Sequence, residues 1–171
     1  SRRQRQMCIR DSNTTIPNIL ALDTARKCGY CIISNGQITE YGEKDLKTKQ
    51  PETELYNLIA EKVGKYNITH IAAEQIYLGT NKATFKKLAD YQGVIKLYAQ
   101  QAALSLDFIE PTTWRRSLLN KAYATKEDVL RHINKNLSPS PQITSDNTAD
   151  AIGIAVCYAR RYFIKEREKR V

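Results

Sequence analysis

The sequence predicts one α/β domain with a mixed five-stranded sheet, made of an antiparallel hairpin plus parallel strands and flanked by helices. Residues 19–22 are apolar at successive positions, which is typical of a strand covered on both faces. Asn35-Gly36 lies between two strand-like segments, a strong hairpin signal. Later strand-like segments alternate with helical ones, which predicts parallel strands joined by right-handed crossovers.

The first half of the chain supplies a strand, a hairpin and a helix. We expect the three strands over residues 19–23, 28–33 and 38–41. Pro51 and the acids after it open a helix whose apolar side chains keep helical spacing at Leu55, Leu58, Ile59 and Val63.

The second half adds two strands and the remaining helices. A buried strand, a long helix and a third parallel strand are expected over residues 71–77, 82–104 and 106–109. Pro111 opens a short helix, and Thr125 caps the next one. The last helix starts near Asn147 and is apolar almost all round, so we expect it to lie against the sheet.

Length and charge divide the chain. Its 171 residues suffice for one domain but hardly for two. Basic residues gather at both ends, so we expect a disordered basic arm (1–17), a single domain (18–164) and a basic tail (165–171). No segment approaches the ~18 apolar residues of a membrane span, and no signal peptide is evident. The four cysteines fit a reducing, intracellular setting, and Cys28 and Cys31 lack the further ligands of a zinc site.

Three acidic residues, Asp23, Glu74 and Asp150, are each the lone charge in an apolar segment. A buried carboxylate is costly unless it is paired or bound to metal. Oxygen ligands without His or Cys suit Mg²⁺ or Mn²⁺, and such a cluster suits two-metal phosphodiester chemistry. The alternative is that each acid is separately exposed or paired with a lysine.

The order and neighbours of these acids resemble the RuvC family of Holliday junction resolvases, within the RNase H-like nucleases. The resemblance covers residues 18–161 and implies an RNase H-like fold. It also implies a homodimer with two active sites, each nicking one strand of a four-way DNA junction. Its motifs are Ile19-Leu20-Ala21-Leu22-Asp23 with Gly29-Tyr30, Ala73-Glu74-Gln75-Ile76-Tyr77 with Asn81 and residues 87–94, Pro111 through Arg116, Ala124-Thr125-Lys126, and residues 149–155.

The resemblance implies roles for single residues. Asp23, Glu74 and Asp150 would bind two Mg²⁺ ions per active site, with Mn²⁺ as a substitute. Lys126 would lie near the scissile phosphate. Tyr77 would take the place of an aromatic that packs against bases near the junction centre; the alternative is a strand-end tyrosine that fills the edge of the core.

Positive charge is concentrated in residues 81–126, which hold eight Lys or Arg against three acids. Such a stretch predicts contacts with the DNA backbone that recognise junction shape rather than sequence. The alternative is a solvated helix face. The residues we expect to bind DNA, besides Tyr77, are Lys82, Lys86, Lys87, Arg115 and Arg116.

One position departs from the family pattern. Three residues before the helix Asp the family often has another Asp, but this chain has Asn147, with Asp146 beside it. An amide oxygen can ligate Mg²⁺ but adds no charge. Either the natural site uses Asn147 together with Asp146, or Asn147 is an engineered change that leaves a binding-competent but impaired nuclease. We favour the second explanation.

Two other functions share these features. A ribonuclease H would act on RNA–DNA hybrids with the same fold and metals, and a catalytically dead module would only bind junctions. An actin-like ATPase would need a Gly-rich phosphate loop, which this chain lacks. A bacterial cytoplasm or nucleoid, a phage-infected cell and a eukaryotic organelle all fit. The sequence determines neither the preferred cleavage dinucleotide nor helper proteins.

Overall fold

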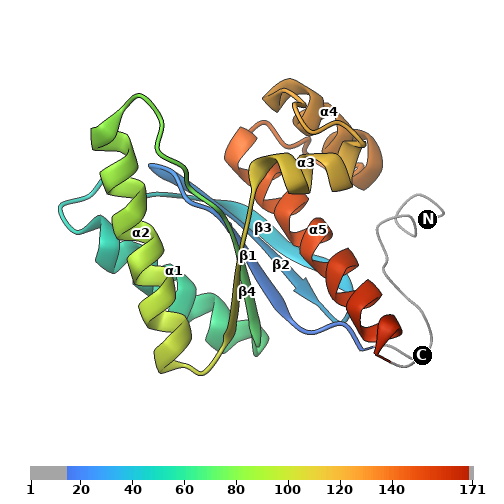
Figure 1. Ribbon diagram of the computed structural model, residues 1–171, viewed down its shortest axis with the longest axis horizontal. Helices are drawn as coiled ribbons and strands as arrows, with labels where there is room; N and C mark the ends of the chain where they lie inside the picture. The colour runs from blue at the N-terminus through green and yellow to red at the C-terminus, as the bar shows by residue number, and fades with distance from the viewer. Residues whose placement is uncertain (1–14, 170–171) are drawn as a thin grey trace.

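The computed structural model describes residues 15–169, which contain a five-stranded sheet in the order β3-β2-β1-β4-β5 (Figure 1). Strand β1 pairs antiparallel with β2 and parallel with β4, β2 pairs antiparallel with β3, and β4 pairs parallel with β5. The mixed sheet predicted from the sequence is therefore confirmed. The strands are β1 (Ile19–Asp23), β2 (Lys27–Ser34), β3 (Gln37–Asp45), β4 (His70–Glu74) and β5 (Ser105–Ile109).

The hairpin turn has the backbone that its sequence predicts. Asn35 and Gly36 both have positive φ, 53° and 72°, as a tight hairpin turn requires. Along β2, Cys28 and Cys31 are buried in different core clusters, on opposite faces of the sheet. Because side chains three residues apart on a strand point to opposite faces, these cysteines cannot share a metal ion.

Helices cover both faces of the sheet (Figure 1). Leu20 and Leu22 face the helices α1 (Pro51–Tyr66) and α2 (Lys82–Gln101), whereas Ile19 and Ala21 face the opposite layer. All four side chains are fully buried, which explains why β1 is apolar at every position. The opposite layer contains α3 (Pro111–Leu119), α4 (Lys126–Leu137) and α5 (Asp146–Glu168).

Two elements are shorter than expected. The strand expected over residues 71–77 ends at Glu74, because the Gln75 N–H donates to the Ile109 carbonyl at the last residue of β5 and no pairing continues beyond it. Glu74 therefore ends a strand instead of interrupting one. The helix expected to reach residue 104 ends at Gln101.

The ordered chain extends beyond the expected domain boundaries. Ile16, within the expected arm, is buried in the core, and α5 continues to Glu168, within the expected tail. Residues 1–14 of the arm and the last two residues of the tail lie outside the described residues, so the disorder of the arm stays a prediction. No helix in residues 15–169 is long and apolar enough to cross a membrane.

Candidate active site

The site begins where β1 ends. Asp23 is the last residue of β1, is 7% exposed, and lies opposite Gly29 of β2. A Cβ atom at Gly29 would lie 1.9 Å from the Asn147 carbonyl oxygen. Only glycine therefore lets the first turn of α5 approach the sheet this closely, and this approach brings α5 beside Asp23.

The start of α5 is fixed by its cap. The Ser145 hydroxyl accepts a hydrogen bond from the Thr148 N–H at 3.2 Å and donates one to Glu43 of β3. Asp150 follows one turn later and is 4% exposed, and its Oδ1 has no hydrogen-bond partner. Burial, followed by the negative charge of Glu74, raises the pKa of Asp150 to about 7.

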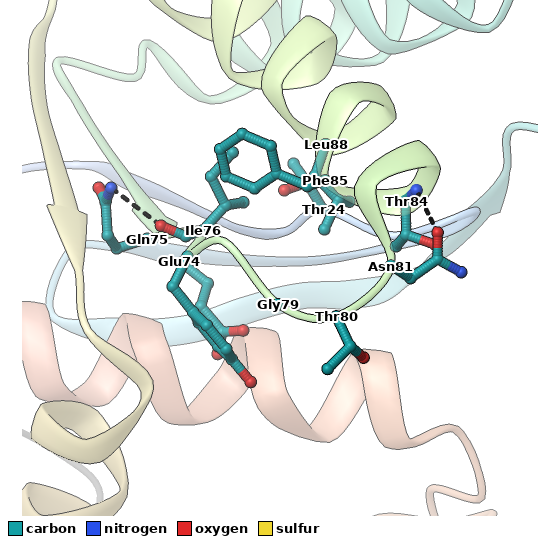
Figure 2. Close-up of a pocket in the computed structure, with 11 residues that line it drawn as sticks. Thr24, Glu74, Gln75, Ile76, Gly79, Thr80, Asn81, Thr84, Phe85 and Leu88 are labelled. Carbon is teal, nitrogen blue, oxygen red and sulfur yellow. Dashed lines mark hydrogen bonds between the residues drawn. The ribbon is translucent and has the colours of Figure 1, made fainter.

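The third carboxylate, Glu74, comes from the end of β4. Its side chain points away from α2, on the opposite side of the loop from Phe85 and Leu88 (Figure 2). The indole N–H of Trp114 donates a hydrogen bond to Glu74 Oε2 at 2.7 Å. Burial raises the pKa of Glu74, while the indole hydrogen bond and the Arg115 guanidinium oppose that rise.

The three carboxylates are close enough to act on one another. Burial raises the pKa of Asp23 well above its ordinary value, and the negative charges of Glu74 and Asp150 raise it further. The positive charges of Lys126 and Arg115 oppose the rise at all three acids. The structure therefore brings together five predicted site residues from β1, β4, α3, α4 and α5, and rules out separately exposed acids.

The donor set fits hard divalent cations. Within residues 15–169, no three His, Cys, Asp or Glu side chains are gathered closely enough to form a metal site as they stand. The unsatisfied Asp150 Oδ1 and the raised pKa values indicate uncompensated negative charge, which Mg²⁺ or Mn²⁺ would neutralise through oxygen ligands.

Asp146 and Asn147 occupy the first turn of α5. Asp146 lies within electrostatic reach of Asp150, whose pKa it helps to raise. The backbone carbonyl of Asn147 faces Gly29, as described above. Both residues therefore lie at the edge of the carboxylate cluster.

The expected DNA-contacting residues differ in their surroundings. Tyr77 is 73% exposed, which rules out a tyrosine that fills the core edge. Lys82, Lys86 and Arg116 are exposed, but Lys87 pairs with Glu52 of α1 at 2.9 Å. A cavity of about 340 Å³ lies between the 75–81 loop and the start of α2, and Glu74 and Tyr77 are among its lining residues (Figure 2).

The sequence analysis did not single out Trp114. It is fully buried, and its indole is the hydrogen-bond donor to Glu74. It is also the only tryptophan in the chain and directly precedes Arg115, a signal that could have drawn attention to it.

Comparison with known proteins agrees with this geometry. The family profile described as crossover junction endodeoxyribonuclease RuvC matches residues 19–158. RuvC from Helicobacter pylori is 26% identical over 151 residues, covering 84% of this chain and 96% of the relative. RuvC from Nitratiruptor is 26% identical over 156 residues, covering 86% and 99%.

Solved structures share the fold. The structure of T. thermophilus RuvC in complex with a Holliday junction substrate superposes with a TM-score of 0.70 at 15% identity, covering 85% of this chain and 96% of the other. The yeast mitochondrial Holliday junction resolvase Ydc2 superposes with a TM-score of 0.60 at 16% identity, covering 85% and 79%. The predicted RNase H-like fold of the resolvases is therefore confirmed.

Proposed function

The chain belongs to the RuvC family of crossover junction endodeoxyribonucleases, and from that premise we propose how it resolves four-way DNA junctions. Two copies bind one junction, and each nicks one strand by metal-assisted phosphodiester hydrolysis. The products carry a 5′ phosphate and a 3′ hydroxyl. A homodimer is required because each protomer supplies one active site, and we place the reaction inside the cell.

The convergence of three carboxylates, two of them buried and Glu74 partly buried, carries the proposal. Asp23, Glu74 and Asp150 come from three different elements, and the negative charge of Glu74 raises the pKa of both Asp23 and Asp150. A structural role would have paired each acid with a close cation, but none of the three forms a salt bridge among the described residues. Uncompensated charge at the carboxyl ends of adjacent strands is a feature of catalytic sites.

The same three residues would hold two Mg²⁺ ions, with Asp146 or Asn147 as a further oxygen donor from α5. When bound, the ions supply a nucleophilic water and stabilise the leaving 3′ oxygen. Asp150, with its pKa raised to about 7, loses its proton more readily as positive charge approaches. The Lys126 and Arg115 side chains offset negative charge that develops on the phosphate.

Lys126 has an unusual position for a cation. It is the first residue of α4, where the helix dipole favours anions, while Thr125 and Asp128 satisfy the capping positions. The positive end of the helix and the lysine therefore attract a phosphate together. Farther from this point, Lys82, Lys86 and Arg116 would contact the DNA backbone, and Tyr77 would contact bases near the junction centre.

The experiment is a cleavage assay with purified protein and Mg²⁺ on synthetic four-way junctions, linear duplex, flap and RNA–DNA hybrid. Symmetrically placed nicks in the junction, with little cleavage of the others, are expected. Preferential cutting of the hybrid would favour a ribonuclease H. Tight junction binding without nicks, in Mg²⁺ or Mn²⁺, would favour a binding module.

A further inference from the structure

We propose that Trp114 is a positioning residue that holds the Glu74 carboxylate in the orientation needed to bind metal. The role rests on the proposed function, in which Glu74 is a metal ligand. The indole N–H occupies one lone-pair site on Oε2, and a carboxylate has about four such sites, so the others stay available to cations.

The hydrogen bond is short and buried. The distance from Trp114 Nε1 to Glu74 Oε2 is 2.7 Å, in the range of charge-assisted hydrogen bonds. Trp114 is 0% exposed, so its N–H has no access to bulk solvent and depends on this one acceptor. Losing either partner would leave a buried polar group unsatisfied.

The indole ring cannot shift freely, because α5 packs directly against it. A Cβ atom at Gly153 would lie 2.8 Å from Trp114 Cζ3 and 2.9 Å from Cε3. Gly153 lies one helical turn after Asp150. The ring that holds Glu74 is thus seated on the helix that carries Asp150, which fixes these two carboxylates relative to each other.

The face of the same ring carries a positive charge. The Arg115 guanidinium carbon lies 5.1 Å from the Trp114 ring centroid, and Arg115 Nε is buried without a hydrogen-bond partner. Trp114 therefore places a carboxylate at its edge and a guanidinium over its face. A phenylalanine could pack in the same space but could not hold the carboxylate.

Removing the N–H has a predictable consequence. Glu74 would be free to rotate away from Asp23 and Asp150, whose negative charges repel it. Loss of such an outer-shell partner typically lowers metal affinity about 10- to 100-fold. We expect Trp114→Phe to weaken Mg²⁺ binding by that factor while leaving the fold intact.

The test uses the full chain without DNA and Mg²⁺ as the probe. Because Trp114 is the only tryptophan, ¹⁵N-labelled protein gives one indole N–H signal. That signal should shift saturably with Mg²⁺ in the unaltered protein and start from a different position in Glu74→Gln, because a neutral amide is a weaker acceptor. Calorimetry of Mg²⁺ binding to Trp114→Phe measures the loss of affinity.

Tyr158→Phe is the matched control. Like Trp114, Tyr158 is a buried aromatic residue near a carboxylate: it lies on α5, and Asp107, away from the site, helps to raise the pKa of its hydroxyl. Its loss should leave Mg²⁺ affinity unchanged.

Two results would overturn the role of Trp114. One is an indole signal that neither Mg²⁺ nor Glu74→Gln moves; this measurement decides the matter even where Trp114→Phe does not fold. The other is a folded Trp114→Phe with unaltered Mg²⁺ affinity. If the unaltered protein nicks junctions and either of these results is found, only the positioning role of Trp114 is refuted. If the indole signal responds to Mg²⁺ but the unaltered protein does not nick junctions, only the proposed function is refuted.

Discussion

Two groups of carboxylates in this molecule have opposite electrostatic surroundings. Glu40 of β3 is bound by Lys62 at 2.5 Å, by Lys65 at 2.9 Å, and by the Tyr66 hydroxyl. Burial would raise the pKa of Glu40, but these hydrogen bonds outweigh it and hold the pKa at about 2. The acids of the candidate site are more deeply buried than Glu40, and their pKa values are raised.

Burial alone therefore does not set the direction in which the pKa of a carboxylate shifts. A partly buried acid with close cations, such as Glu40, joins β3 to α1 and contributes to stability. Acids without close cations repel one another, and a bound cation or a bound proton relieves that repulsion. The two groups should therefore respond in opposite directions to mutation and to pH, and four predictions follow from that contrast.

The largest effect is expected for the active-site acids. Changing Asp23, Glu74 or Asp150 to its amide should lower junction nicking at least about 1,000-fold, because bound metal supplies several kcal/mol of charge stabilisation. Junction binding should persist, and the metal-free protein should become more stable because repulsion is relieved. Gel assays of nicking and binding, with urea unfolding in EDTA, measure all three. A variant with near-full nicking would remove that residue from the site.

The second prediction concerns pH. The pKa of Asp150 is about 7 in the folded protein against an ordinary 3.8, so the folded state binds the proton more tightly. Proton binding at Asp150 therefore makes its full contribution to stability below about pH 4. This contribution, up to about 4 kcal/mol, is lost as the pH rises through 7. Urea unfolding in EDTA from pH 4 to 8 measures the loss.

Asp150→Asn should flatten the dependence of the unfolding free energy on pH between pH 4 and 7. Added Mg²⁺ should reverse the dependence in the unaltered protein, because metal favours the ionised carboxylates. Glu40 should behave oppositely, since its lowered pKa contributes stability above about pH 4.5 that is lost only as the pH falls toward 2. A slope that Asp150→Asn leaves unchanged would assign the pH dependence to other groups.

The third prediction tests Glu40. Glu40→Gln removes the nearer of the two carboxylates that Lys62 contacts and leaves only the exposed Glu61, at 2.9 Å, while the Lys62 side chain is only 6% exposed. We expect a loss of about 3 kcal/mol in the free energy of unfolding, typical of a broken buried pair. Nicking should be unaffected. Glu54→Gln breaks an exposed pair with Lys44 and, as the control, should cost less than about 1 kcal/mol.

The sequence singled out the three acids of the candidate site but not the Glu40 cluster, for a physical reason. Asp23 and Asp150 stand out because each is the lone charge in a buried apolar segment. Strand order places Asp23 near Glu74, whereas the packing of α5 against β1 and β2 brings Asp150 to them. Glu40 lies on an exposed-looking edge strand, and its partner Lys62 is 22 residues away on a helix. Nothing local indicates such a pairing, because it depends on how α1 packs against β2 and β3.

Contacts between residues far apart in the sequence also explain the other differences between the predictions and the structure. The end of β4 at Glu74 is set by its partner β5, which comes more than thirty residues later. The role of Trp114 depends on a contact across 40 residues, so periodicity could not reveal it. Gly29 was noticed as part of a motif, but its function of admitting the Asn147 carbonyl needed the three-dimensional approach of α5.

The smallest effect concerns Asn147, where a substitution adds one more negative charge beside Asp23, Glu74 and Asp150. Asn147→Asp adds a carboxylate next to Asp146 and one turn before Asp150, whose pKa is already raised by neighbouring acids. Repulsion should lower the stability of the metal-free protein, whereas Mg²⁺ affinity should rise about tenfold, equivalent to about 1.4 kcal/mol. Nicking should increase with it. Calorimetry and the junction assay measure both changes.

Asn57→Asp is the control, because it adds the same charge on the exposed face of α1. It should change neither Mg²⁺ affinity nor nicking. If Asn147→Asp behaves like this control while the unaltered chain nicks junctions efficiently, the site works with the amide as it stands. In that case Asp146 is the acid that completes it, and Asp146→Asn should then abolish the activity that Asn147→Asp failed to improve.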